Sequence, residues 1–121
     1  MSLFDTNLIE KQPIVGSVSR AASIYMGLVR EHRANLLSAR KTHGEESIGN
    51  VLKLYKSITE NRANDDDNIY IENFACNCVK GNWYIVFDVY KWYNRGQGHV
   101  CLTYDKDFNL TKSIIKEANP V

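Results

Sequence analysis

Apolar positions change their spacing once along the chain, near Ile69. Before this point apolar residues recur at the spacing of one helix face, and after it they alternate with polar residues, as in a strand with one covered face. Helices followed by alternating strands are typical of α+β domains. We therefore predict a single α+β domain at residues 17–121, preceded by an N-terminal arm at residues 1–16 that Pro13 keeps irregular.

Two helices are predicted in the first half of the chain. The first covers residues 17–39, with a serine as the cap at its start, and its wide apolar face indicates that other elements cover it. The second begins with the capping-box pair Thr42 and Glu45 and ends near Asn61, where the polar, acidic stretch ENRANDDDN indicates a loop. The connection between the helices is short, so we expect them to pack against one another.

Four strands are predicted in the second half, joined by short turns that favour antiparallel neighbours. In the turn KGN, Gly81 supplies the unusual backbone angles of a tight hairpin. The expected fold is therefore α+β, with two N-terminal helices packed on a four-stranded antiparallel meander sheet. The predicted strands cover residues 69–79, 83–93, 99–104 and 110–118.

The order of elements over residues 17–117 resembles the cystatin-like and nuclear-transport-factor-like α+β folds. The resemblance implies a strongly bent sheet that wraps a helix, forms a cone and often dimerises through the sheet. Because such folds carry binding proteins, assembly factors and small-molecule enzymes alike, the resemblance implies no particular activity and no site residues.

The stretch WYIVFDVYKWY, at residues 83–93, separates into two rows because successive side chains of a strand point to opposite faces. The odd-numbered row is apolar and is predicted to face the helices, whereas the even-numbered row is amphipathic and is predicted to face outward. The same alternation places His99, Cys101 and Thr103 on the outer face. The odd row is Trp83, Ile85, Phe87 and Val89, and the even row is Tyr84, Val86, Asp88, Tyr90 and Trp92.

Charge pairing and apolar packing together predict how the first two strands align. The predicted register places Glu72 opposite Lys91 and Cys76 opposite Phe87. Cys76 and Cys78 then face the apolar row, which favours small buried residues over metal ligands or a redox pair.

Composition narrows the class of protein further. The chain has 121 residues, of which 44% are hydrophobic and 24% charged, as in ordinary soluble domains. The longest apolar run, residues 83–87, is too short to cross a membrane, and the N-terminus lacks a secretory signal pattern, so we expect a cytoplasmic protein. A net charge of +1 argues against a nucleic-acid partner. An odd number of cysteines, three, favours reduced thiols.

The outer face of the predicted sheet is the first candidate site. Aromatic side chains around one carboxylate are typical of a surface that meets a protein partner. We therefore expect a small non-enzymatic binding or interaction domain that forms a homodimer through this face. Another protein is the alternative partner. The residues expected there are Tyr84, Asp88, Tyr90, Trp92, Cys101 and Thr103.

Two alternative functions are compatible with the same sequence. A cavity between the first helix and the sheet, lined by Tyr25 and His32, would suit a small-molecule binder or a lyase- or isomerase-like enzyme. A stoichiometric inhibitor or immunity-type protein would suit the small size of the chain.

Catalytic chemistry has a weaker basis in the sequence. Two sets share the outer strand face, Asp88, His99 and Thr103, or Cys101 with His99, but a shared face does not establish hydrogen bonds between them. No catalytic motif is present, so no catalytic residue, cofactor or metal site is assigned.

Overall fold

The computed structural model of the chain describes residues 16–67, 69–91 and 97–117. In this part the strands form one antiparallel sheet in the order β1-β2-β3-β4, so the predicted α+β class and meander sheet are confirmed. Residues 1–15 of the predicted arm at residues 1–16, and the outer-face residue Trp92, lie outside the described residues. The elements are α2 (Ser17–Glu31), α3 (Arg33–His43), α4 (Glu45–Asp67), β1 (Ile69–Val79), β2 (Asn82–Lys91), β3 (Gln97–Tyr104) and β4 (Leu110–Glu117).

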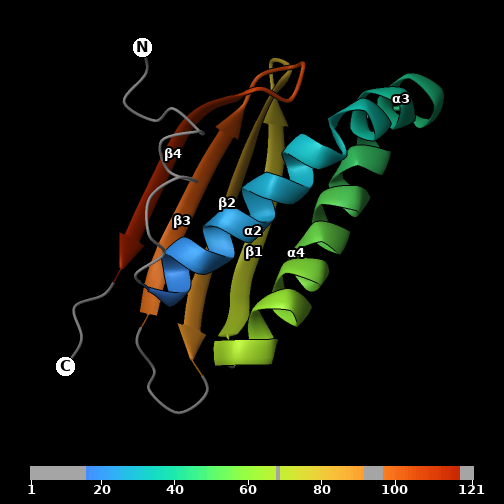
Figure 1. The fold of residues 1–121 in the computed structure, drawn as a ribbon. Helices are drawn as coiled ribbons and strands as arrows, with labels where there is room; N and C mark the ends of the chain where they lie inside the picture. Colours follow the sequence, from blue (N-terminus) through green and yellow to red (C-terminus); the bar gives the residue numbers. More distant parts are fainter. Residues whose placement is uncertain (1–15, 68, 92–96, 118–121) are drawn as a thin grey trace.

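The helices cover one face of the sheet. Figure 1 shows α2 crossing the sheet, with α4 beside it. Helix α2 contacts β2, β3 and β4, and α4 contacts β1. The helices α2 and α4 pack against one another, although α3 joins them where a short turn was predicted. The core therefore lies between these helices and the sheet, and the opposite face of the sheet is left uncovered by the described helices.

The first helix is divided at His32, which corrects the predicted continuous helix over residues 17–39. His32 leaves helical geometry at φ −105° and ψ 17°, so that α3 begins at Arg33. Long-range contacts hold α3 in its own direction: Arg33 Nε donates to the Asp107 carbonyl at 2.7 Å, and Arg40 donates to the Lys106 carbonyl. The sequence did not predict this break because these acceptors lie in the distant turn between β3 and β4.

The second helix begins and ends later than predicted. Thr42 lies inside α3 rather than at a cap, and Gly44, with φ 83°, separates α3 from α4. Helix α4 continues to Asp67 through the stretch that was predicted to be a loop. Tertiary packing favours the extension, because Ala63, which lies beyond the predicted end of the helix, is fully buried.

The two faces of β2 divide as predicted. The odd row is buried, with Trp83 4% exposed and Phe87 1% exposed. On the helix side of the sheet, Phe87 lies 5.5 Å from Tyr25, measured between ring centroids, and 6.2 Å from Phe74. On the outer side Tyr84 is 42% exposed.

The predicted register of β1 and β2 is wrong. Lys80 and Gly81, with φ 52° and 84°, form the two central residues of the hairpin turn. Cys76 therefore pairs with Ile85 instead of Phe87, although it keeps its predicted side of the sheet. Farther along, a bulge between Glu72 and Ala75 shifts the alignment again, and Glu72 lies opposite Asp88 rather than Lys91.

The first turn of α2 is capped from the far end of the chain. Gly16 is the N-cap residue and no serine side chain caps the helix, which corrects the predicted serine cap. Instead Glu117 of β4 accepts hydrogen bonds through Oε1 from the backbone N–H groups of Val18 and Ser19, at 3.1 and 3.0 Å. The carboxylate also lies at the positive end of the helix dipole, where a negative charge stabilises the helix.

Replacing Glu117 with alanine is expected to lower the free energy of unfolding by about 1 kcal/mol, the usual effect of removing a helix cap. Glu117→Gln keeps an acceptor but loses the charge, so it should have a smaller effect. Urea denaturation followed by circular dichroism measures both changes. Glu31→Ala, which removes a carboxylate from the unfavourable C-terminal end of the same helix, is the control and should not destabilise the protein. Equal effects of Glu117→Ala and Glu31→Ala would contradict the cap.

Candidate functional site

A charged row crosses the outer face of the sheet, with one residue from each strand. Glu72 of β1 pairs with Asp88 of β2, Asp88 with His99 of β3, and His99 with Lys116 of β4. These four residues, named here the charged row, lie in register because each pair occupies directly opposite positions on neighbouring strands. The acidic residues occupy one half of the face, and the lysine and the histidine occupy the other.

Aromatic and aliphatic side chains surround the charged row. On one side Tyr70 and Tyr90 pair across β1 and β2, with ring centroids 6.4 Å apart. On the other side Tyr84 is 42% exposed, and Ile114 of β4 lies opposite Cys101. Exposed aromatic side chains on an uncovered sheet face indicate a surface that contacts a partner.

A chain of hydrogen bonds joins three residues in the middle of this face. His99 Nδ1 lies 2.8 Å from Asp88 Oδ1, and His99 Nε2 lies 3.2 Å from Cys101 Sγ. Asn73, placed by the β1 bulge, donates through Nδ2 to the other Asp88 oxygen at 2.9 Å. The histidine therefore connects a carboxylate to a thiol, in the order in which nucleophile, base and orienting acid occur in hydrolase triads.

The electrostatics of Asp88 fit its place in this chain. The hydrogen bond from Asn73 is the largest influence on its pKa, followed by the hydrogen bond from His99, and together they lower the pKa below its ordinary value. Asp88 is therefore ionised near neutral pH and accepts the Nδ1–H of His99. This arrangement leaves Nε2 of His99 directed at the thiol of Cys101.

The residues predicted for the outer face are brought together by the pairing of β2 and β3. Tyr84 lies opposite Thr103, and Asp88 lies opposite His99. Cys101 is two residues along β3 from His99, on the same face. Tyr90 is on the same face at the end of β2, opposite Gln97. Trp92, the remaining member of this predicted set, is outside the described part of the chain.

Tyr25 and His32 occupy structural positions. Tyr25 is fully buried, its hydroxyl donates to the Leu52 carbonyl at 3.0 Å, and burial is the main cause that raises its pKa well above the ordinary value. His32 lies at the junction of α2 and α3, with Nδ1 3.1 Å from the Leu28 carbonyl and its ring centroid 5.7 Å from that of Tyr55. These contacts give both side chains packing roles.

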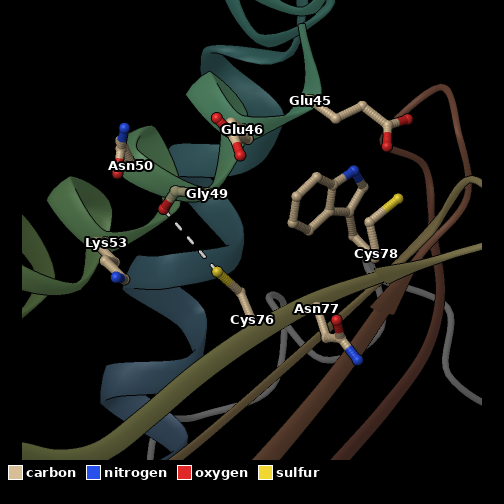
Figure 2. Close-up of a pocket in the computed structure, with 9 residues that line it drawn as sticks. Glu45, Glu46, Gly49, Asn50, Lys53, Cys76, Asn77 and Cys78 are labelled. Carbon is tan, nitrogen blue, oxygen red and sulfur yellow. Dashed lines mark hydrogen bonds between the residues drawn. The ribbon is translucent and has the colours of Figure 1, made fainter.

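A groove with a volume of about 480 Å³ opens between the start of α4 and the end of β1. Figure 2 shows Glu45, Glu46 and Lys53 on the helix side of this groove, facing Cys76 and Cys78 on the strand. Burial is the main cause that raises the pKa of both thiols, and the nearby Glu45 raises that of Cys78 further. Both thiols therefore stay protonated near neutral pH.

The described residues contain neither a cluster of metal ligands nor a membrane-spanning helix. Among these residues no group of three or more histidine, cysteine, aspartate or glutamate side chains is arranged to hold a metal ion. No helix described here has the length and apolar character needed to cross a membrane.

Three functional residues of the outer face were missed from the sequence: Glu72, Asn73 and Lys116. Glu72 was assigned to the wrong partner because the bulge at Asn73, where φ is 54°, was not foreseen. A signal for the bulge is present, since the apolar positions change from odd to even between Ile71 and Phe74, with an asparagine between them that tolerates positive φ.

No protein-family model matches this chain, and neither a curated protein nor a solved structure matches it.

Proposed function

We propose that this chain is a self-associating interaction domain, in which the outer face of the sheet packs against the same face of a second copy. The observation that carries the proposal is the order of charges along the charged row. Glu72 and Asp88 lie toward the β1 edge, and His99 and Lys116 lie toward the β4 edge. Such a row is complementary to itself when it is reversed.

The order of charges favours one symmetric arrangement over another. If the two-fold axis runs parallel to the strands, β1 of one copy lies over β4 of the other, so Glu72 faces Lys116 and Asp88 faces His99. If the axis runs across the strands, β1 lies over β1, and Glu72 faces Glu72. Because like charges at an interface are costly, the first arrangement is preferred. It also keeps the strands of the two sheets nearly aligned, as in β-sandwiches.

Apolar side chains supply the main driving force for the proposed contact. Tyr70, Tyr84 and the partly buried Tyr90, Val86 and Ile114 share the outer face with the charged row. Their burial against a second copy would be favourable, while the charged row sets the orientation. The cystatin-like or nuclear-transport-factor-like layout proposed from the order of elements would likewise place self-association on the sheet.

The test uses two opposite charge reversals, Glu72→Lys and Lys116→Glu. Each variant alone places like charges at both of the symmetric contacts, so the dissociation constant of its homodimer should rise about tenfold or more. When the two variants are mixed, both contacts become attractive again, and a heterodimer should form. Sedimentation velocity measures each homodimer, and native mass spectrometry detects the heterodimer when one of the two variants is uniformly labelled with nitrogen-15, which separates the masses of the two chains.

Lys106→Glu is the matched control for Lys116→Glu, because both replace an exposed lysine with glutamate. Lys106 lies in the turn after β3, away from the outer face. It should leave association unchanged. A wild-type chain that stays monomeric at high micromolar concentration would refute self-association. Dimerisation that neither reversal weakens would refute the proposed orientation.

A further inference from the structure

We propose that Cys101 is a nucleophilic thiol that exchanges with small, negatively charged disulfides, with His99 as its base and Asp88 as a positioning residue. The inference concerns the single chain and does not depend on self-association. It rests on the continuous hydrogen bonding from Asp88 through His99 to Cys101, at 2.8 and 3.2 Å.

The geometry gives each member of the chain one role. Asn73 and His99 both donate to Asp88, which fixes the carboxylate and, through Nδ1, the orientation of the imidazole. With Nδ1–H directed at Asp88, Nε2 is directed at the thiol and can accept its proton. A thiolate beside a protonated histidine is the usual form of a reactive cysteine.

The site is open to small molecules. The side chain of His99 is 49% exposed and that of Asp88 is 37% exposed, and Cys101, which is partly buried, lies beside them on the outer face. On the neighbouring strand β4, Ile114 lies opposite Cys101. Lys112 and Lys116 lie two residues to either side of Ile114, on the same face. These lysines favour a disulfide that carries carboxylates.

The reaction is balanced without any further oxidant. His99 takes the proton of Cys101, and the thiolate attacks one sulfur of the disulfide. The bond between the two sulfurs of that molecule breaks as the bond from Cys101 Sγ forms. The departing thiolate takes the proton from His99 and leaves as a thiol. Cys101 is thereby oxidised to a mixed disulfide, while half of the small disulfide is reduced.

The two remaining cysteines provide an internal comparison. Cys76 and Cys78 face the groove shown in Figure 2, where the Cys76 thiol lies 3.9 Å from the Gly49 carbonyl. Burial raises the pKa of both thiols, and Glu45 opposes thiolate formation at Cys78. Neither has a histidine among the residues that line the groove. The structure therefore predicts strong selectivity among three thiols of one chain.

The test measures the rate at which oxidised glutathione modifies each cysteine in a dilute solution of the folded protein near neutral pH. Peptide mass spectrometry locates the adduct, and Cys101 should react about tenfold or more faster than Cys76 or Cys78. His99→Gln should lower the Cys101 rate about tenfold, while His43→Gln, which removes an exposed histidine at the end of α3, should not.

Asp88→Asn and Asp88→Glu together test the positioning role. Asp88→Asn removes the carboxylate that orients His99 through Nδ1, so the Cys101 rate should fall, and Asp88→Glu should restore part of it because a carboxylate is present again. A merely structural role would change the Cys76 and Cys78 rates as well and would give no rescue by glutamate. A variant that fails to fold is recognised because Cys76 and Cys78 then become as reactive as Cys101.

Equal modification of the three thiols, or an unchanged rate in His99→Gln, would overturn the proposal. The same assay separates it from self-association, because the proposed dimer covers Cys101. If modification is selective but does not slow at high protein concentration, the dimer is refuted and the reactive thiol stands. If modification is unselective while the charge-reversal variants behave as expected, the reactive thiol is refuted and the dimer stands.

Discussion

Adding one methyl group at Gly98, by Gly98→Ala, is expected to lower the free energy of unfolding by about 1–3 kcal/mol, the usual effect of overpacking a core. Gly98 lies on β3 where α2 crosses the sheet. A Cβ atom there would overlap the Val18 side chain and would lie 2.5 Å from the Lys116 carbonyl oxygen. Both neighbours are constrained, because one belongs to the core and the other to the backbone of β4.

Gly27→Ala is the control for this substitution. Gly27 lies in α2, and a Cβ atom there would meet nothing within 4 Å. Because alanine is the better helix former, this variant should gain up to about 1 kcal/mol. Thermal and urea denaturation measure the two variants side by side. A Gly98→Ala protein as stable as wild type would show that α2 does not approach β3 this closely.

The second large effect is expected on β2. Substitutions on its inner face should change folding stability, and substitutions on its outer face should change self-association. Phe87→Ala removes a side chain that is 1% exposed and packs against Tyr25 and Phe74, so it should cost about 3–5 kcal/mol of folding stability. Tyr84→Ala removes a side chain that is 42% exposed, so the monomer should lose less than about 1 kcal/mol.

The proposed dimer should respond in the opposite order. Tyr84→Ala should weaken self-association, because a large aromatic side chain is lost from the contact face. Stability is measured by urea denaturation at low concentration, where the monomer dominates, and association by sedimentation. A Tyr84→Ala chain that is as destabilised as Phe87→Ala, or one that associates like wild type, would contradict the division of roles.

The strands and their faces could be predicted from the sequence because both depend on local alternation. The predicted bounds of β1, residues 69–79, match the structure, and the inward row of β2 is buried as expected. Alternation is insensitive to an error of two residues in register, since parity is unchanged. For this reason Cys76 was placed on the correct face but opposite the wrong partner.

The remaining features depend on contacts between distant residues. The break at His32 and the extension of α4 follow from packing and from arginine contacts to the turn after β3, which no local pattern records. The outer face shows the same limit. Parity placed Asp88, His99 and Cys101 together, but only the register of β2 and β3 brings Asp88 within hydrogen-bond distance of His99. The bulge at Asn73 adds the contact of that residue with Asp88.

The long-range cap on α2 has a consequence for how the chain acquires its structure during synthesis. Val18 and its capping partner Glu117 are separated by 99 residues, so the partner is synthesised after the described helices and after β1, β2 and β3. Until the ribosome has added Glu117, α2 lacks the carboxylate that caps its start. Completion of β4 therefore adds the strand that pairs with β3 and caps α2 in the same event.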